Sequence, residues 1–328
     1  MPSSPGPLTF TRYDMMEAGS AAALFAGSTE VCGIYVLEFE DEMRYVGQTR
    51  QIVARYSAHR RRRGDIVALS FAPCPITDLD ECERREIRRQ ESAHSLRNLN
   101  LTGWPAGRGD LDVTVEDGTS IFLPWERERR VRLGDGHEGG DTTMQRRFWD
   151  LAARPDYEEM ADALARYVDE CIPDPFGTQR VLWTIVASPS TSRTAEDRRL
   201  FTLSCGGRET LFAREYVKGR SSRVEICMNV DGDRVRESRP ASSVRDIVEL
   251  FSMRTETVPY GNEIISRSVV RSWRQLERVL ARSHFAEGAY RLNTTQMRRR
   301  SSPYRRHHNQ AFADDILRRA AARSRRTS

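Results

Sequence analysis

Apolar residues near the start of the chain come in short blocks that are separated by polar residues. Residues 31–39 form one apolar run, and residues 43–47 form a second after an acidic turn, which predicts two neighbouring strands. Residues 51–63 and 78–90 instead have the composition and apolar spacing of helices. The block therefore alternates between strand and helix character.

The segments on either side of this block follow other patterns. Residues 1–30 form an N-terminal extension with one short helical stretch at 13–26, and the sequence GDGHEGGD at 134–141 is typical of a linker. Helices are predicted at 142–152 and 156–171. The second of these helices carries an apolar stripe that consists of Tyr157, Met160, Ala161, Leu164, Tyr167, Val168 and Cys171.

The last part of the chain predicts a second, mixed β/α domain. Residues 180–230 are rich in strand-forming runs, and helical patterns follow at about 243–252 and 268–284. Four aromatic residues are expected in the core of this domain, although such side chains can instead stack on bases. They are Trp183, Phe201, Phe212 and Trp273. The fold class is therefore α/β in the broad sense (α+β), with two domains.

Charge is distributed unevenly along the chain. Lys218 is the only lysine, so 51 of the 52 basic residues are arginine, which indicates codon bias as well as function. Residues 291–328 hold eleven arginines against two aspartates, a net charge of +9, whereas the whole chain carries +5. The remainder is therefore acidic. Such a basic tail either binds a polyanion, most often nucleic acid, or is solvated and partly disordered.

No apolar run approaches the roughly 20 residues that a membrane span requires, and the N-terminus lacks the charged and apolar regions of a signal peptide. We therefore expect a cytoplasmic protein without membrane association. The six cysteines have no CxxC or zinc-finger spacing, so they are expected to be reduced and mostly buried.

Two tyrosines lie on the predicted strand pair. If the intervening loop is Phe39–Asp41, Tyr35 faces Tyr45 across the strands and both phenols point to one face. A two- or four-residue loop would place them on opposite faces. Taken alone, such a pair is typical of a hydrophobic core.

The helix at 51–63 places two polar side chains beside apolar ones. Arg55 and His59 share a face with Ile52 and Tyr56, which is unusual for a merely solvated helix. A guanidinium suits a phosphate because it is always charged and offers a planar fork of donors. The adjacent run Arg60–Arg63 either attracts a nucleic-acid backbone or is a plain exposed helix end.

The helix at 78–90 carries Glu83 on the same face as Ile87. An inward carboxylate needs a partner because burying an unpaired charge is costly. A divalent cation is one such partner. An ion pair with Arg55 is the structural alternative.

These residues occur in the order and spacing of the motifs of one known family. The motifs are Gly33-Ile34-Tyr35, Tyr45-Val46-Gly47-Gln48-Thr49, Arg55-x-x-x-His59, Glu83-Arg84-x-x-Ile87 and Asn100-Leu101-Thr102-Gly103. Each is weak alone, but five in order over about 70 residues resemble the GIY-YIG nucleases. The resemblance covers roughly a quarter of the chain.

The resemblance implies a three-stranded antiparallel sheet flanked by helices and phosphodiester hydrolysis with one Mg²⁺ or Mn²⁺ ion. Glu83 would be the metal ligand, and Arg55 would steady the phosphate. One of the tyrosines would activate or orient water, and His59 would be an auxiliary hydrogen-bonding residue. Asn100 matches the asparagine of the motif, although Asn98 competes for that position.

The expected organisation is an extension at 1–30, a nuclease domain at 31–133, a linker with helices at 134–175, and a mixed domain at 176–328 whose basic tail is 291–328. The last domain would position or select DNA. Residues expected to contact nucleic acid are Gly47, Gln48, Arg60, Arg61, Arg62, Arg298, Arg299, Arg300, Arg305 and Arg306.

His307, His308 and Asn309 faintly suggest a second metal site, but no third ligand pattern accompanies them. The leading hypothesis is a DNA endonuclease, with a restriction or defence role favoured over repair or structure-selective nicking. The alternative of another class is a binding protein that keeps the nuclease fold without its activity.

Overall fold

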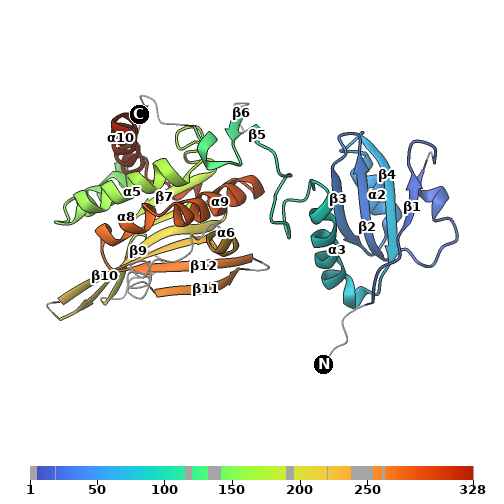
Figure 1. The fold of residues 1–328 in the computed structure, drawn as a ribbon, viewed down its shortest axis with the longest axis horizontal. Helices are drawn as coiled ribbons and strands as arrows, with labels where there is room; N and C mark the ends of the chain where they lie inside the picture. Colours follow the sequence, from blue (N-terminus) through green and yellow to red (C-terminus); the bar gives the residue numbers. More distant parts are fainter. Residues whose placement is uncertain are drawn as a thin grey trace. The chain divides into compact units, whose positions relative to one another are not determined.

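A computed structural model describes residues 6–18, 20–114, 120–131, 142–189, 196–219, 221–237, 254–260 and 263–327 (Figure 1). The chain divides into two compact units, Met1–Arg108 (unit 1) and Gly109–Ser328 (unit 2), and each has hydrophobic clusters of its own. Both units combine helices with antiparallel sheets, so the expected mixed α+β class is confirmed. No helix of the described part of the chain is long and apolar enough to span a membrane.

Unit 1 is a four-stranded antiparallel sheet in the order β1-β4-β2-β3, one strand more than the family resemblance implies. The strands are β1 (Thr11–Asp14), β2 (Gly33–Phe39), β3 (Arg44–Thr49) and β4 (Ile66–Pro73). The helices are α1 (Ala21–Leu24), α2 (Ile52–Arg60), η1 (Ile76–Asp78) and α3 (Leu79–Ala93). The predicted strands at 31–39 and 43–47 and both predicted helices are thus present, whereas the helix expected at 13–26 is reduced to α1 and is preceded by β1.

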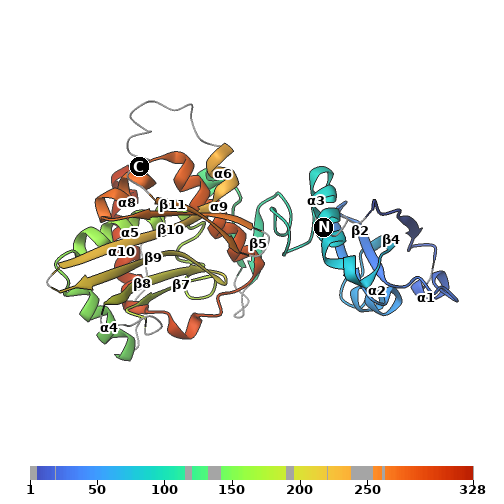
Figure 2. The same ribbon diagram turned by 90° about the horizontal axis from the view of Figure 1, so that it is seen from below.

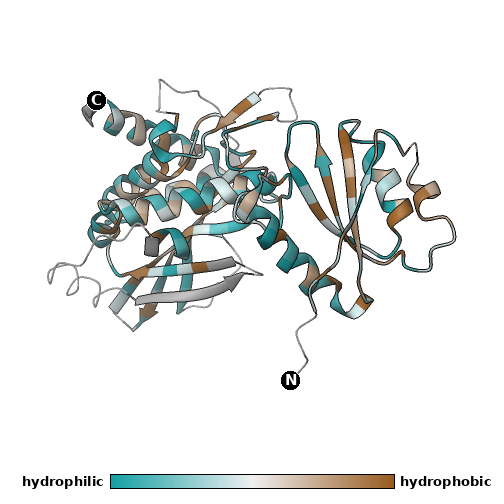
Figure 3. Cartoon of the chain, turned by 45° about the vertical axis from the view of Figure 1, so that its right-hand side comes forward, coloured by the Kyte–Doolittle hydropathy of each residue, from teal (hydrophilic) through white to brown (hydrophobic). Residues whose placement is uncertain are grey.

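Alternation along the strands divides the core of unit 1 between the two faces of its sheet. One cluster joins Tyr35 and Leu37 of β2 to Ile52 and Tyr56 of α2. The other joins Ile34 and Val36 to residues of α3, among them Cys82 and Ile87. The central strands accordingly carry mostly hydrophobic colours in Figure 3. Helix α2 therefore covers one face of the sheet and α3 covers the other.

The hairpin between β2 and β3 differs from the expected register by two residues. Tyr35 pairs with Gly47 and Leu37 pairs with Tyr45, so Tyr35 and Tyr45 are diagonal neighbours rather than partners. The turn is centred one residue later than expected: the backbone nitrogen of Phe39 donates to the carbonyl oxygen of Met43 at 3.1 Å, and Glu42 inside the turn has a left-handed backbone conformation (φ 64°). A shift of two residues preserves the face, so both phenols still lie on the α2 side.

Two motif glycines make room for their neighbours. A Cβ on Gly47 would lie 2.5 Å from Oη of Tyr35, and a Cβ on Gly33 would lie 2.1 Å from the carbonyl oxygen of Ala72. The ring of Tyr35 thus crosses the bare backbone of Gly47. Gly47, expected to contact nucleic acid, has a packing role in the structure.

Unit 2 is built on a six-stranded antiparallel sheet in the order β11-β12-β10-β9-β8-β7 (Figure 2). These strands are β7 (Trp183–Ala187), β8 (Asp197–Cys205), β9 (Arg208–Lys218), β10 (Ser221–Asp231), β11 (Arg254–Tyr260) and β12 (Glu263–Val270). A separate hairpin consists of β5 (Leu111–Thr114) and β6 (Ser120–Leu123). The expected β-rich character of 180–230 is confirmed.

The helical elements of unit 2 are η2 (Arg127–Arg129), α4 (Thr142–Ala152), α5 (Tyr157–Cys171), α6 (Gly232–Glu237), α8 (Trp273–Leu280), α9 (Ser283–Arg299), η4 (Arg305–His307) and α10 (Gln310–Thr327). The apolar stripe predicted for α5 is buried along its whole length. All four predicted core aromatics are buried as well, with Trp183 and Phe201 at 0% exposure.

The boundaries of the expected domains differ from the two units. Residues 109–131 and helices α4 and α5 belong to unit 2, because Leu123 and Leu164 join the same hydrophobic cluster as its sheet. The glycine-rich segment 134–141 and the helix expected at 243–252 lie outside the described residues. The helix expected at 268–284 is interrupted, since β12 runs to Val270 and a new helix begins at Ser283.

The basic C-terminal segment is folded rather than a solvated tail. It contains the second half of α9 and all of α10, and Met297, Phe312 and Ile316 are almost fully buried in the core. The expectation of a tail at 291–328 was therefore wrong. Arginine density was misleading there because the apolar residues between the arginines form the inner faces of two helices.

Candidate active site

Three side chains of the sequence motifs meet on the α2 face of unit 1. The hydroxyl of Tyr35 lies 2.8 Å from Nε2 of His59, and Nε of Arg55 donates to the same hydroxyl at 3.0 Å. Arg55 offers only donors, so the hydrogen of the hydroxyl needs another acceptor. The arrangement that satisfies all three groups has Tyr35 donate to an unprotonated Nε2 of His59.

The electrostatics agree with a neutral imidazole. Burial lowers the pKa of His59 to about 4, and the charges of Arg55, Arg63 and Arg62 act in the same direction. Burial also raises the pKa of Tyr35, against the hydrogen bond from Arg55. At neutral pH the cluster therefore holds a phenol, a neutral imidazole and one guanidinium charge.

Tyr45 lies next to this cluster but is more accessible. Its ring centroid is 6.2 Å from that of Tyr35 and 5.1 Å from that of His59, and the guanidinium of Arg63 lies 5.0 Å from its ring centroid. The hydrogen bond to Tyr35 raises the pKa of Arg55. Tyr35 is 0% exposed, whereas Tyr45 is only partly buried. The two tyrosines are thus close in space but unequal in their access to solvent.

Glu83 lies on α3, on the other face of the sheet. Its Oε2 accepts a hydrogen bond of 3.0 Å from Nε2 of Gln48, and the same amide donates to Oδ1 of Asp80 at 2.6 Å. Burial raises the pKa of Glu83, while hydrogen bonding by Gln48 and the charge of Arg55 oppose the rise. Gln48 therefore holds two carboxylates together.

The sequence did not single out Asp80. It precedes Glu83 by three residues on α3, a spacing that places two side chains on neighbouring positions of one helix face. That spacing is the signal that would have found it. Gln48, expected to contact nucleic acid, is occupied with these two carboxylates.

The two faces of the site are connected at strand β3, which is an edge of the sheet. Along β3, Tyr45 points to the α2 face of the sheet and Gln48 points to the α3 face. Gly47 lies between them in the sequence and has no side chain. Glu83 influences the pKa of Tyr35, and Arg55 influences that of Glu83. Among the described residues no salt bridge joins Arg55 to Glu83, so the structural alternative of an ion pair is not what the structure contains.

The donor set around Glu83 fits a hard divalent cation. Within the described residues its hydrogen-bond donor is a neutral amide, so no hydrogen-bonded cation there balances its charge. In the described part of the chain no three His, Cys, Asp or Glu side chains gather into a metal cage. A Mg²⁺ or Mn²⁺ ion here would be held by Glu83, with Asp80 beside it, and would keep water or substrate oxygens as its other ligands, as Mg²⁺ usually does.

Asn98 and Asn100, the two candidates for the asparagine of the motif, differ in burial and in their contacts. Asn98 is 5% exposed, accepts a hydrogen bond from the backbone nitrogen of Val46 at 2.9 Å, and donates to the carbonyl oxygen of Val46 at 2.8 Å. Asn100 is exposed. The side-chain amide of Asn98 therefore fixes the strand between Tyr45 and Gly47, whereas Asn100 does not contribute to the cluster.

The basic run after α2 is only partly available to a ligand. Arg61 and Arg62 are exposed, whereas Nη1 of Arg60 donates to the carbonyl oxygens of Gly64 and Ile66. Arg60 thus closes the loop that follows the helix. Arg61 and Arg62 remain suitable for contact with a polyanion.

The arginines predicted to bind nucleic acid in unit 2 have mixed positions. Arg298 is 4% exposed, donates to the carbonyl oxygens of Gly109 and Leu123, and stacks on Trp125, so it is a structural residue. Arg299 and Arg305 are half-buried. Arg300 and Arg306 are exposed, with Arg300 packed against Gly207.

Two residues of the His307–Asn309 segment of unit 2 bind the backbone of the fold. His308 is 7% exposed, and its Nδ1 accepts from the backbone nitrogen of Ile185, while burial lowers its pKa to about 4. Asn309 accepts from the backbone nitrogen of Phe312 at the start of α10. These polar groups satisfy backbone groups of the fold, and among the described residues no three potential metal ligands gather.

Comparison with known proteins assigns no family to the chain. No family model matches it, and no solved structure matches it. Human MICAL-like protein 2 is 28% identical over 133 residues, which cover 39% of this chain but 14% of that protein. This partial similarity spans too little of the relative to indicate a shared family.

Proposed function

We propose that unit 1 is the catalytic unit of a metal-dependent DNA endonuclease. The observation that carries the proposal is the hydrogen-bonded group of Tyr35, Arg55 and His59, together with the carboxylate of Glu83, whose hydrogen-bond donor in the described part of the chain is the neutral amide of Gln48. Phosphodiester hydrolysis adds negative charge in the transition state, and this arrangement supplies a fixed positive charge, proton acceptors and a cation site.

Arg55 is suited to bind the scissile phosphate. Its Nε is oriented by Tyr35, and the residue as a whole is exposed, so its terminal nitrogens remain accessible. A guanidinium fixed at one end loses less conformational freedom when it binds an anion. Arg61 and Arg62 on the following turn add attraction for the DNA backbone.

The two tyrosines have different roles in this proposal. Tyr45 is the phenol that meets water or phosphate, because Tyr35 is 0% exposed and its hydroxyl is already engaged on two sides. Tyr35 is a positioning residue for Arg55 and His59. His59 stays neutral at physiological pH, so its Nε2 remains the hydrogen-bond acceptor that holds Tyr35 in place.

Glu83 would hold a divalent ion, with Asp80 and Gln48 beside it. Such an ion, when bound, offsets negative charge on the phosphate and lowers the pKa of water. Gln48 keeps the carboxylate of Glu83 oriented toward the edge strand. Unit 2 would then select the DNA, in a restriction or defence role in the cytoplasm.

The test is cleavage by the full-length protein. Supercoiled plasmid and single-stranded DNA are incubated with Mg²⁺, Mn²⁺ or EDTA, and the products are sequenced at their ends. Glu83→Gln and Arg55→Ala should lose activity by about 100-fold or more, as the loss of one group that stabilises the transition state does in other enzymes. Glu81→Gln and Arg88→Ala, two exposed positions on α3, are the matched controls and should keep it.

Two results would contradict the proposal. The first is intact DNA under every metal condition, and the second is cleavage that Glu83→Gln leaves unchanged. Salt-sensitive DNA binding without cleavage, equal in the wild type and Glu83→Gln, would instead favour a binding protein that keeps the fold.

A further inference from the structure

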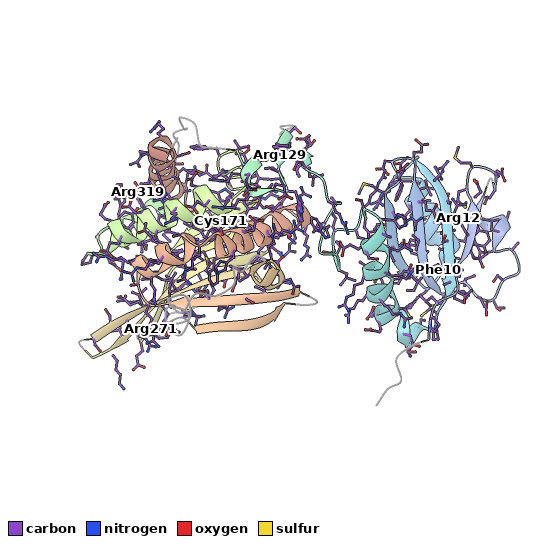
Figure 4. All side chains as sticks on the ribbon, viewed as in Figure 1. Phe10, Arg12, Arg129, Cys171, Arg271 and Arg319 are labelled. Carbon is purple, nitrogen blue, oxygen red and sulfur yellow. The ribbon has the colours of Figure 1, made fainter. Side chains whose placement is uncertain are left out.

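Unit 2 contains a polar pocket of about 360 Å³ that has no part in the proposed nuclease chemistry. Its lining residues come from the last turns of α5 and α10, from η2 and the residue after it, and from the junction of α8 with α9. Arg129 and Cys171, which are labelled in Figure 4, are the sequence neighbours of two of its lining residues. All of the lining residues belong to unit 2.

The pocket concentrates positive charge. Four arginines line it, against the two carboxylates of Asp169 and Glu170, which leaves an excess of two positive charges. The arginines are Arg127, Arg130, Arg166 and Arg323. Their partly buried positions reduce solvent screening, so their charges act more strongly on a ligand than exposed ones would.

One carboxylate is shared by several of these arginines. Glu170 accepts from Arg127 at 3.1 Å and from Arg166 at 2.8 Å, and Nη2 of Arg323 lies 3.9 Å away. Arg127 and Arg130 also donate to the backbone carbonyls of Glu170 and Asp169. These bonds cap the C-terminal end of α5 and fix the guanidinium planes in the absence of a ligand.

Three of the guanidinium groups keep a terminal nitrogen outside these bonds. Within the described residues, Nη1 of Arg127, Nη2 of Arg130 and Nη2 of Arg166 make no hydrogen bond. Capping alone would not require so many donors at one place. An anion with several oxygens is the ligand that complements them.

The N-terminus of α9 adds to the positive electrostatic potential of the pocket. Ser283 lines the pocket and is the first residue of this 17-residue helix, whose N-terminus has no side-chain cap. The first backbone N–H groups of a helix favour negative charge, and they reinforce the arginines here.

The size and the acceptors of the pocket indicate more than a bare anion. A volume of about 360 Å³ exceeds that of one phosphate group, and it lies at the lower end of the usual range for small-molecule sites. Asp169 and Glu170 can accept hydrogen bonds from hydroxyl groups, and Ser283 and Ser324 add further polar groups. Apolar ligands would not suit this lining.

We propose that this pocket binds a sugar-borne phosphate monoester, with the phosphate on Arg127, Arg130 and Arg166 and the sugar hydroxyls toward the two carboxylates. Three sources share this chemistry: a free sugar phosphate, a nucleoside 5′-monophosphate and the phosphorylated end of a nucleic acid strand. The proposal does not depend on the nuclease activity of unit 1, because its residues and its readout belong to unit 2 alone.

The test is direct binding to the full-length protein by calorimetry and thermal shift. The ligands are inorganic phosphate, ribose 5-phosphate, adenosine 5′-monophosphate and a trinucleotide with or without a 5′-phosphate; ribose and adenosine are the unphosphorylated controls. Phosphorylated forms should bind and raise the Tm, and removal of the phosphate should weaken binding about tenfold or more. The ranking of the three phosphorylated ligands identifies the source.

Two pairs of variants locate the site. Ser283→Asp adds a negative charge to the pocket and should lower affinity about tenfold, whereas the neutral Ser283→Asn should not. An acidic first residue suits a helix N-terminus, so Ser283→Asp should fold normally. Arg166→Gln should weaken binding similarly, whereas Arg278→Gln, an exposed arginine of α8, should leave it unchanged.

The proposal is overturned if none of the phosphorylated ligands binds, or if binding is equal in the wild type, Ser283→Asp and Arg166→Gln. Should Arg166→Gln fail to fold, the Ser283 pair decides alone. If inorganic phosphate binds as tightly as ribose 5-phosphate, the assignment of the sugar is wrong.

Discussion

The hydroxyl of Tyr35 lies 2.8 Å from Nε2 of His59; Tyr35 is 0% exposed and His59 is half-buried. A phenol that accepts from Arg55 and donates to His59 links α2 to strand β2 through one oxygen atom. This oxygen fixes the orientation of the guanidinium that would meet the phosphate.

Replacing each tyrosine by phenylalanine separates positioning from direct contact. Tyr35→Phe keeps the ring but removes two hydrogen bonds, so it should lower the free energy of unfolding by about 1–3 kcal/mol and also reduce cleavage. Tyr45→Phe should reduce cleavage with little change in stability, because Tyr45 is only partly buried. Urea unfolding and plasmid nicking measure the two effects. Equal stability losses in both variants would contradict the assigned roles.

His59 makes unit 1 sensitive to acid. Its pKa is about 4 in the folded chain and about 6.5 when unfolded, so the unfolded state binds the proton more readily between these values. The stability that depends on neutral His59 is therefore complete above pH 6.5 and is lost as the pH falls toward 4. After allowance for solvent screening at this half-buried site, we expect a loss of about 1–2 kcal/mol.

The matched comparison for this acid effect is His59→Gln. This variant should show a weaker pH dependence of the free energy of unfolding between pH 4 and 6.5. His308 in unit 2 contributes equally to the wild type and to His59→Gln, so its effect cancels when the two profiles are subtracted. Parallel pH profiles for the wild type and His59→Gln would rule out the neutral imidazole as the source.

Glu83 is expected to destabilise the metal-free protein. Burial raises its pKa, so ionisation costs more in the folded than in the unfolded state and stability falls as the pH rises through its pKa. Glu83→Gln should therefore raise the Tm at pH 7–8 in EDTA. Added Mg²⁺ or Mn²⁺ should raise the Tm of the wild type and of the control Glu81→Gln, but not that of Glu83→Gln. An equal metal response in all three would place the ion elsewhere.

Asn98 and Asn100 should differ sharply when replaced by alanine. Asn98→Ala leaves the buried N–H and C=O of Val46 without their partners, which should cost about 2–4 kcal/mol of unfolding free energy. Asn100→Ala changes an exposed residue and should stay within about 0.5 kcal/mol. Chemical denaturation of both variants measures these free energies of unfolding. Similar losses in the two variants would contradict the structural role of Asn98.

Gly47→Ala tests the close contact between the bare strand and the phenol ring. The added Cβ would meet Oη and Cζ of Tyr35 at 2.5 and 2.6 Å, so we expect a loss of about 1–3 kcal/mol and a displaced hydroxyl. Gly64→Ala is the control, since nothing lies within 4 Å of a Cβ there. Thermal unfolding and nicking should both distinguish the two, and an unaffected Gly47→Ala would contradict the packing role.

The sequence predicted the local elements of unit 1 well because their patterns are local. Spacing of three and four residues was enough to place Arg55 beside His59 on one helix face. It did not predict the register of the β2–β3 hairpin, whose turn contains Glu42 in a left-handed backbone conformation. It also could not decide between Asn98 and Asn100, since the deciding contact is with Val46, about fifty residues away in sequence.

In unit 2 the sequence was least informative where charge was densest. The roles of Arg298 and His308 depend on carbonyl and amide groups of strands far away in the chain, namely Leu123 and Ile185. No short stretch of sequence around Arg298 or His308 contains these partners. Their burial therefore became visible only in the folded chain.

Trp125 shows what this means for the electrostatic properties of the protein. The guanidinium carbons of Arg291 and Arg298 lie 3.3 and 4.4 Å from its ring centroid, and Arg298 reaches two backbone carbonyls beyond it. Positive charges committed in this way cannot exchange counterions with a phosphate backbone. If the protein binds DNA as proposed, the dependence of its affinity on salt concentration should therefore include neither Arg291 nor Arg298 among the phosphate contacts.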